Sequence, residues 1–522
     1  MLFRSYCGLA HLQAAEFLYE THGLPEAAYR FKHALTQEVA YGSLLLERRR
    51  VLHARIVEAL ETLTPERVAE GPSGTKGFPA GRQDLDQVNR LVHHALAGAV
   101  WDKALLYCRQ AGHKAMTRSA HHEAVRYFEQ ALHALAHLPQ TRNTREQAID
   151  LRLSLRSALH PTGDLGRAKA YLKEAEILAA ALDDPRRLGH VSVYLSLHFY
   201  LMGAYDQAIG AAQRALALAS ASGDVALQLL ANLHLGIAYQ TQADYRRAID
   251  CLSQTLTTVD SHERFGEYIL AVFTPAYLAA CHAELGTFAE GRFVADEGLR
   301  IAEAVDHPMS LTFALWGCGL LALRQGDLSR AVTLLERAVR LCQDMGRPAS
   351  FPLMAAALGA TYNLAGRSGD AMLLLAPALE QAMASEVVVN QATCSLTLGE
   401  AQMIAGLLEE AQVLAEGALS LARMRHERGN EAYALYLHGE LAGRREAPDC
   451  ALAADHYQQA LVLAEELGMR PLQAHCHRGL GTLYRQTGRG AQARAALAIA
   501  ITLYRAMDMT FWLPQAEAAL AS

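Results

Sequence analysis

The stretch LGIAYQTQADYRRA, residues 235–248, carries the pattern on which the fold prediction rests. Gly236 is small, Tyr239 one turn later is large, and Ala248 is small again. A small residue lets two helices cross closely, and a large residue one turn away fills the space beside the crossing. The pattern therefore predicts two antiparallel helices, joined by a turn around Ala243, with Ala248 on the second helix where it meets the first.

The same pattern recurs at a nearly constant interval along the chain. Small residues that mark the second helix of each pair stand at Ala168, Ala208, Ala248, Gly291, Ala331, Ala371, Ala411, Ala453 and Ala493. Successive markers are 40 to 43 residues apart. Glycines that mark the turn inside a pair stand at Gly203, Gly286, Gly326, Gly366, Gly406 and Gly488. Such self-similarity is typical of a solenoid, in which each helical pair covers the apolar face of the next.

We therefore predict an all-α protein with a tetratricopeptide-like (TPR-like) α-solenoid, a right-handed superhelix of antiparallel helix hairpins with about 40 residues per repeat. This period exceeds the roughly 34 residues of the common TPR, so each helix should be about one turn longer. Glycine and proline at the joints between repeats are expected to end the second helices. Examples are Ser222-Gly223-Asp224, Gly429-Asn430 and Gly468-Met469-Arg470-Pro471.

The array is predicted to span residues 146–508. The sequence FWLPQAEAAL in residues 509–522 is predicted to form a capping helix that covers the last apolar face. Residues 86–145 are predicted to be an irregular helical lead-in, because Ala104 and Ala124 are only 20 positions apart. Residues 64–85, which contain GPSGTKGFPAG, are predicted to be a linker rich in glycine and proline.

Composition limits the classes of protein that remain. The chain has 522 residues, of which 51% are hydrophobic and 20% charged, as in folded globular proteins. A net charge of -6 gives no electrostatic reason to expect nucleic acid. The nine cysteines are scattered singly, which is typical of reduced thiols in a cytoplasmic protein. No apolar run approaches the roughly 18 residues of a membrane span.

Groups that could carry chemistry are few. The segment GPSGTKG, residues 71–77, lacks the spacing of a phosphate-binding loop and the strand that should precede it. Neighbouring histidines, His93-His94 and His121-His122, point about 100° apart on a helix and make poor metal sites. The same holds for His475-Cys476-His477, so structural or surface roles are favoured. Arg48-Arg49-Arg50 could contact DNA, but a solvated face or an interdomain contact is favoured.

The run FKHALTQEVAYGSLLLERRRVLHARI, residues 31–56, resembles the end of the ATPase module in a family of bacterial signalling proteins. That family joins a class III adenylate/guanylate cyclase domain, a STAND-type P-loop ATPase and a C-terminal TPR array. Later runs resemble the same array, and the resemblance covers nearly the whole chain. They are AHHEAVRYFEQALHALAHLP (120–139), LGMRPLQAHCHRGLG (467–481) and YRAMDMTFWLPQAEAAL (504–520).

The resemblance implies that residues 1–63 form the winged-helix-like end of an ATPase module. The family's phosphate loop, G-x-x-x-x-G-K-[ST], does not occur in the sequence. Nor does the sequence contain a cyclase domain with its metal-binding aspartate pair. No catalytic, cofactor or metal-binding residue can therefore be carried over, and we predict that the chain is not an enzyme. It resembles the C-terminal piece of such a protein, or a stand-alone relative.

Function is then expected to follow from shape. The first helices of stacked hairpins line a concave wall that typically grips a peptide or a helix. The repeat places these candidate partner-binding residues on that wall: Tyr200, Gln240, Trp316, Arg324, Asn363, Arg478 and Arg485. Trp316, among small residues, either fills a gap in the core or anchors a ligand.

The favoured hypothesis is a non-catalytic scaffold or sensor arm, with a protein or peptide ligand in the groove and possibly an ATPase or cyclase module as partner. One alternative is a STAND-type transcriptional regulator that contacts DNA through residues 1–63. The other is a piece of a nucleotide cyclase or ATPase whose catalytic domains are absent from this chain.

Overall fold

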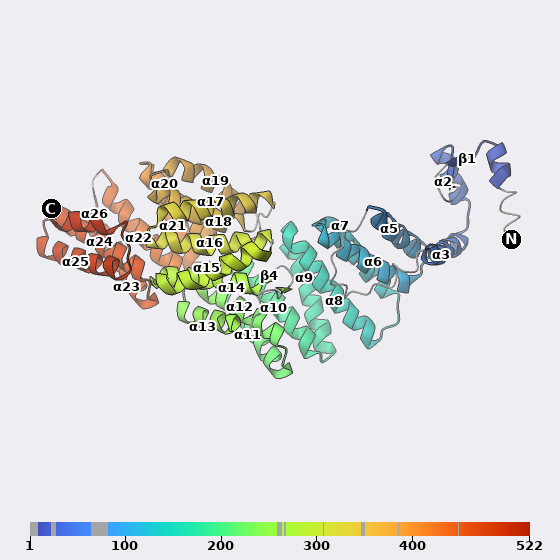
Figure 1. Ribbon diagram of the computed structural model, residues 1–522, viewed down its shortest axis with the longest axis horizontal. Helices are drawn as coiled ribbons and strands as arrows, with labels where there is room; N and C mark the ends of the chain where they lie inside the picture. The colour runs from blue at the N-terminus through green and yellow to red at the C-terminus, as the bar shows by residue number, and fades with distance from the viewer. Residues whose placement is uncertain are drawn as a thin grey trace. The chain divides into compact units, whose positions relative to one another are not determined.

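The protein is described by a computed structural model that covers residues 9–21, 28–63, 82–257, 264–265, 268–305, 307–345, 350–384, 386–446 and 448–521. The chain folds as two compact units, residues 1–158 and 159–522 (Figure 1). Within these described ranges, every helix is too short or too polar to cross a bilayer.

The first unit begins with a small hairpin and continues as helices. Residues 9–14 are helical, and β1 pairs antiparallel with β2, Leu18 opposite Phe31. Helix α6 packs against both α5 and α7, so one helix takes part in two neighbouring hairpins. The elements are β1 (Leu18–Thr21), β2 (Ala28–Phe31), α2 (Ala34–Gly42), α3 (Leu46–Leu63), α5 (Arg82–Ala97), α6 (Trp101–Thr117), α7 (His121–Ala136) and α8 (Arg142–Leu159).

The predicted linker is partly wrong. Helix α5 begins at Arg82, so residues 82–85 are helical and continuous with the amphipathic helix that buries Leu91. Residues 64–81 of the linker lie outside the described residues. A hairpin followed by two helices is compatible with a winged-helix-like end, which stays a prediction.

Arg49 is held inside the first unit. Its Nε donates to the Leu44 carbonyl at 2.8 Å and its Nη2 to the Gly42 carbonyl at 3.1 Å. Its guanidinium lies 4.9 Å from the centre of the Tyr41 ring. The side chain thus caps the end of α2, whereas Arg48 and Arg50 are exposed.

The second unit is an array of helical hairpins (Figure 1). Each marker residue predicted from the sequence is the fourth residue of a second helix and is buried, which confirms the period. Its helices are η1 (His160–Thr162), α9 (Leu165–Ala181), α10 (Pro185–Leu201), α11 (Tyr205–Ser222), α12 (Val225–Thr241), α13 (Tyr245–Leu256), α14 (Leu270–Leu285), α15 (Phe288–Val305), α16 (Pro308–Gln325), α17 (Leu328–Asp344), α18 (Phe351–Leu364), α19 (Ser368–Ala384), α20 (Gln391–Ile404), α21 (Leu408–Arg425), α22 (Arg428–Arg444), α23 (Cys450–Leu467), α24 (Arg470–Gln486), α25 (Gly490–Ala506) and α26 (Leu513–Ala521). Two very short strands, β3 (Arg264–Phe265) and β4 (Tyr268–Ile269), precede α14.

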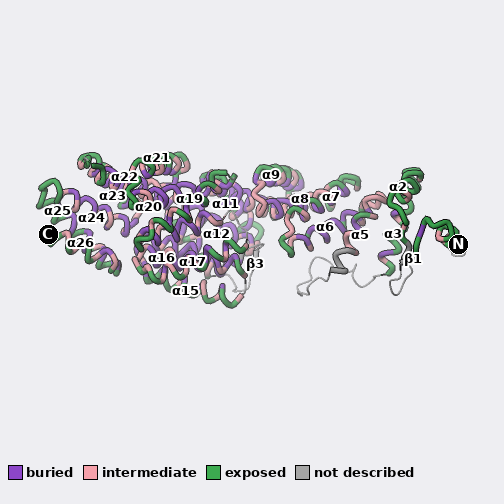
Figure 2. Tube along the Cα trace, turned by 90° about the horizontal axis from the view of Figure 1, so that it is seen from above, coloured by how far each residue is buried: buried purple, intermediate pink, exposed green. Residues whose placement is uncertain are grey.

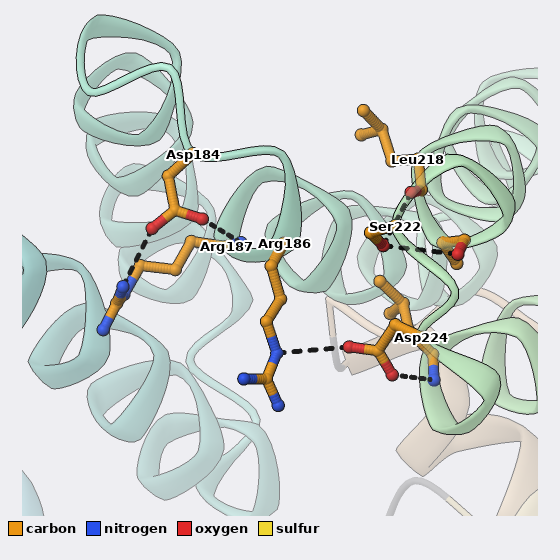
Figure 3. A network of polar contacts seen from close by, with 8 residues as sticks. Asp184, Arg186, Arg187, Leu218, Ser222 and Asp224 are labelled. Atoms are coloured by element: carbon orange, nitrogen blue, oxygen red, sulfur yellow. Dashed lines mark hydrogen bonds and ion pairs between the residues drawn. The ribbon is translucent and has the colours of Figure 1, made fainter.

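Aspartates begin many of these helices. The Asp184 carboxylate accepts from the Arg187 backbone N–H at 3.0 Å, and that of Asp224 accepts from the Leu227 N–H at 3.1 Å (Figure 3). These bonds satisfy backbone donors that a helix cannot pair internally. Arg186 then donates to Asp224 at 3.2 Å, which ties the start of α10 to the start of α12.

One predicted joint is wrong by a few residues. Helix α21 ends at Arg425, and His426 takes the left-handed conformation with φ of 58°. Gly429, expected to end that helix, instead lies inside α22, packed against Ala243 and Tyr245. Its small size is needed for that contact rather than for the helix end.

The first helix of each hairpin lies in an inner layer and the second in an outer layer. Helices α12, α14 and α16 are buried on nearly all sides and correspondingly apolar all round. Helices α13 and α17 each bury one narrow stripe and expose the opposite face. Figure 2 shows the same alternation of buried and exposed stretches along the array.

Successive coils of this solenoid rest directly on one another. Four turn residues each approach a residue 185 or 186 positions further along the chain, and the pairs are Gly203 with Val388, Ala243 with Gly429, Gly286 with Pro471, and Gly326 with Phe511. The backbone takes part, since the Val388 N–H donates to the Leu201 carbonyl at 2.9 Å. The array therefore closes on itself after between four and five repeats.

The C-terminal segment completes this closure. Helix α26 packs against α25. Met509, Trp512 and Ala516 also share a buried cluster with Phe288 and Leu321 from the middle of the array. The cap thus covers the end of the array and the edge of an earlier coil.

Replacing Gly326 by alanine tests the contact between coils. Its φ is 92°, and an added Cβ would lie 2.7 Å from the Phe511 Cβ. Gly366 is the matched control, because its φ is 74° but nothing lies within 4 Å. We expect Gly366→Ala to cost about 1 kcal/mol of unfolding free energy and Gly326→Ala about 1–3 kcal/mol more. Denaturant unfolding of both variants gives the comparison, and equal losses would contradict the contact.

Candidate functional site

A cavity of about 490 Å³ lies inside the coil of the second unit. Its lining comes chiefly from the inner helices, and it follows the repeat. One row of lining residues is Tyr200, Gln240, Glu284, Arg324, Leu364, Ile404 and Arg444. A second row is Leu320, Ala360, Glu400 and Glu440, and a third is Trp316, Ala356, Leu396 and Tyr436. Neighbours in each row lie on successive inner helices. The superhelix therefore directs side chains from corresponding parts of successive repeats towards one cavity.

Six of the seven candidate residues predicted from the sequence line this cavity; they are Tyr200, Gln240, Trp316, Arg324, Asn363 and Arg478. Arg485 is not among the lining residues. Its Nη1 donates to the Ala519 carbonyl at 3.3 Å, so it holds the last helix in place. A role for any of them in binding a partner stays a prediction.

Trp316 fills a gap in the core and also borders the cavity, and a role in anchoring a ligand stays a prediction. Its side chain is only 3% exposed and belongs to the main core. The ring packs edge-on against Tyr277, with centroids 5.3 Å apart, and lies 6.3 Å from the Phe313 ring. It therefore fills core volume and also contributes to the cavity wall.

A buried ion pair ties two walls of the cavity together. The Glu284 carboxylate on α14 accepts from the Arg324 Nε at 2.8 Å and from the Tyr433 hydroxyl at 2.7 Å. The Arg324 guanidinium also lies 4.6 Å from the centre of the Tyr433 ring. Tyr433 is on α22, and burial raises the pKa of its hydroxyl well above the ordinary value. The hydroxyl therefore stays protonated and acts as a donor.

A second polar cluster surrounds Glu440. Its carboxylate accepts from the Tyr457 hydroxyl at 2.7 Å, from the Tyr436 hydroxyl at 3.2 Å and from the Arg444 Nη2 at 3.2 Å. Arg478 donates in turn to the Tyr436 hydroxyl at 3.3 Å. The arginines and tyrosines of this wall are thus already paired within the protein.

Glu427 is likewise occupied. It accepts from the Tyr205 hydroxyl at 2.8 Å and from the Asn430 amide at 2.7 Å. Because Tyr205 belongs to α11 and Glu427 precedes α22, this bond is another contact between successive coils.

Asn363 and Glu400 differ from the other polar groups of the cavity. The Asn363 Nδ2 donates to the Thr397 carbonyl at 3.1 Å and to the Glu400 Oε2 at 3.3 Å. Two acceptors fix the orientation of this amide, so its Oδ1 faces the other way. That Oδ1 is buried and has no hydrogen-bond partner, although Asn363 is only 4% exposed. Buried polar atoms are normally paired, so this atom is an exception, and a donor from outside the protein would reach it only after a neighbouring side chain moves.

His475 lines the cavity, whereas its neighbours Cys476 and His477 are not among the lining residues. Its Nδ1 lies 2.8 Å from the Tyr504 hydroxyl, and its ring packs 4.8 Å from Trp512. Burial lowers the pKa of His475 well below the ordinary value, so the ring is neutral at pH 7. Cys476 is fully buried in the core, away from the cavity lining.

Comparison with known proteins supports the fold. No family model matches the sequence, and no curated protein matches it. The structure is similar to a Rap protein complexed with Competence and Sporulation Factor, with a TM-score of 0.54 and 13% identity over 70% of this chain and 98% of that chain. Together with the repeat of helical hairpins, this likeness establishes a TPR-like α-solenoid.

Two further structures are similar at lower scores. NprR in complex with its cognate peptide NprX has a TM-score of 0.48 and 13% identity, over 69% of this chain and 98% of that chain. A STAND protein with a tetratricopeptide repeat sensor from Pyrococcus horikoshii has a TM-score of 0.40 and 14% identity, over 71% of this chain and 54% of that chain.

Replacing Glu284 by glutamine tests whether the buried ion pair holds the walls together. The change leaves the Arg324 charge without its carboxylate, and we expect a loss of about 2–3 kcal/mol of unfolding free energy. Asp296→Asn is the matched control, because Asp296 pairs with Arg330 on the exposed face of the outer layer. That change should cost no more than about 1 kcal/mol. A similar loss in both variants, measured by denaturant unfolding, would contradict the role of Glu284.

Proposed function

We propose that the second unit is a binding module that takes an extended peptide, or an extended segment of a partner protein, into its central cavity. The observation that carries this proposal is the cavity formed by the inner helices, whose mostly apolar lining includes four glutamates, with the unpaired acceptor of Asn363 beside Glu400. Its volume lies within the range of roughly 300–1,000 Å³ typical of ligand pockets. The similar Rap protein was crystallised in complex with Competence and Sporulation Factor, which supports a binding role for this kind of coil.

We further propose that the cavity recognises a cationic side chain of the ligand. Four glutamates line it, and Glu284, Glu427 and Glu440 each accept from tyrosine hydroxyls of the protein. Glu400 accepts from the Asn363 amide. An arginine or lysine of the ligand could donate to the Glu400 carboxylate, and also to the Asn363 Oδ1 after a small movement of the side chains that cover that atom. Charge-assisted hydrogen bonds of this kind are stronger than neutral ones and fix orientation.

Binding alone accounts for this arrangement, so we propose a non-catalytic scaffold or sensor arm. The resemblance of the sequence to cyclase–STAND ATPase–TPR proteins supports a place in bacterial cytoplasmic signalling, with an ATPase or cyclase module as the responding partner. DNA contact through the first unit is less well supported, because Arg49 of the basic run is already bonded within the protein.

Peptide mixtures of defined composition test the proposal. The probes are amidated pentapeptide mixtures with a fluorescent label at the N-terminus, and their central residue is fixed as arginine, glutamine or glutamate. The full chain is titrated into each mixture, and binding is followed by the fluorescence anisotropy of the label. We expect the arginine mixture to bind at least about tenfold more tightly than the other two, because it pairs with Glu400. Glu400→Gln should remove this preference, whereas Glu410→Gln, on the exposed face of α21, should leave it unchanged.

The two parts of the proposal fail in different ways. If none of the three mixtures binds, the cavity is not a peptide site. If peptides bind but the preference for arginine is absent, or survives in Glu400→Gln, the cationic subsite is wrong while peptide binding stands.

The pH dependence of binding gives an independent check. Burial raises the pKa of Glu400 above its ordinary value, with Asn363, Arg324 and Arg444 acting in the opposite direction and Glu440 reinforcing it. A cation needs the ionised carboxylate, so affinity for the arginine mixture should fall as the pH drops from 7 through this raised pKa. The fall should begin at a higher pH than for an ordinary glutamate. In Glu400→Gln the residual affinity should not change over the same interval, and an identical fall in that variant would contradict the assignment.

A further inference from the structure

Three histidine side chains meet where α3 packs against α5 in the first unit. His53 comes from α3, and His93 and His94 come from α5. Each offers one ring nitrogen, and these three nitrogens all lie within 4.8 Å of one another. Among the residues that the structure describes, these three histidines are the one group of at least three His, Cys, Asp or Glu side chains placed closely enough to hold a metal ion.

The packing explains why the sequence alone argues against such a site. Neighbouring residues on a helix point about 100° apart, so His93 and His94 cannot by themselves enclose an ion. His53 fills the sector between them, with ring centroids 5.8 Å from His93 and 5.0 Å from His94. The third ligand therefore comes from a different helix, about forty positions earlier in the chain.

The hydrogen bonds of His53 orient one of its nitrogens into the cluster. Its Nε2 lies 2.9 Å from the Tyr41 hydroxyl, and its Nδ1 lies 2.7 Å from the Nδ1 of His94. When the Tyr41 oxygen accepts from Nε2–H, the Nδ1 lone pair faces His94 and His93. A partner on the second ring nitrogen is what usually fixes the tautomer and orientation of a metal-binding histidine.

One charged neighbour opposes a bound cation. Arg90 lies on α5, one turn before His94, and its positive charge acts on the His94 ring. Its repulsion lowers the affinity expected of the site.

We propose that His53, His93 and His94 form a binding site for a divalent transition-metal ion, with Zn²⁺ as the best match. Imidazole nitrogen is a preferred zinc ligand, and three histidines with one position left for water form a common zinc arrangement. Nitrogens bound tetrahedrally to zinc lie about 3.3–3.4 Å apart, as follows from zinc–nitrogen distances of roughly 2.0–2.1 Å. The observed separations span this value, so small side-chain rotations close the site.

An ion can reach this site from solvent, and its binding would link two helices. His93 is exposed, so an ion reaches the cluster from solvent without opening the core. A bound ion would join α3 to α5, the two helices on either side of residues 64–81. The ion would thereby hold α5, the first helix of the predicted lead-in, in its packing against α3.

Titration of the full chain with ZnCl₂, by calorimetry and by competition with a colorimetric chelator, tests this site. We expect one equivalent to bind and expect CoCl₂ to give the visible absorption of four-coordinate Co²⁺. His53→Ala and His93→Ala should each weaken binding at least tenfold. His93→Ala keeps the test valid if the buried His53→Ala fails to fold, because the His93 side chain is exposed.

His137→Ala is the matched control, because His133 and His137 form a second close histidine pair in this unit, with His137 stacked on Trp101. This variant should leave the affinity unchanged. The proposal is overturned if micromolar Zn²⁺ does not bind, or if binding survives in His93→Ala. It is also overturned if binding is lost in His137→Ala, which would place the ion at the other pair.

Discussion

The contact between successive coils of the solenoid is the constraint on which the second unit depends. In an open solenoid each repeat touches only its neighbours, and its concave wall faces solvent. Here the turn at Gly203 meets Val388 and the turn at Gly326 meets Phe511, so the first coil supports the last. The same closure turns a groove into a partly closed cavity, and it explains why α12, α14 and α16 are apolar on nearly every side.

Enclosure changes the electrostatics of the lining. Charged groups that would be solvated on an open wall must find partners inside, because an unpaired buried charge is costly. Glu284, Arg324 and Tyr433 meet this need across the cavity, and Glu440 meets it among tyrosines and Arg444. Against this background the unpaired Oδ1 of Asn363 is unusual, and it is the reason for placing a ligand donor beside Glu400.

The local pattern of the repeat was predictable from the sequence, and much of the cavity lining followed from it. Small residues such as Ala331 mark the period of the repeat. Glu284 lies 40 residues before the predicted Arg324 and also lines the cavity, so the same period could have predicted it, although the sequence analysis missed it. Glu400 and Glu440 are likewise 40 residues apart and could have been predicted as a pair. The closure of the coil could not be predicted, because it depends on small rotations per repeat that accumulate over more than four repeats. Two further contacts could not be predicted from the sequence, the bond of Arg485 to the last helix and the meeting of His53 with His93 and His94, because each joins residues of different helices whose packing the repeat does not specify.

The most direct test is an experimental structure of the full chain bound to a peptide with one central arginine. The account predicts that the peptide lies inside the cavity, with the guanidinium within hydrogen-bonding distance of the Glu400 carboxylate and the Asn363 Oδ1. A peptide bound on the outer helices, or a coil whose turns stand apart at Gly203 and Gly326, would contradict it.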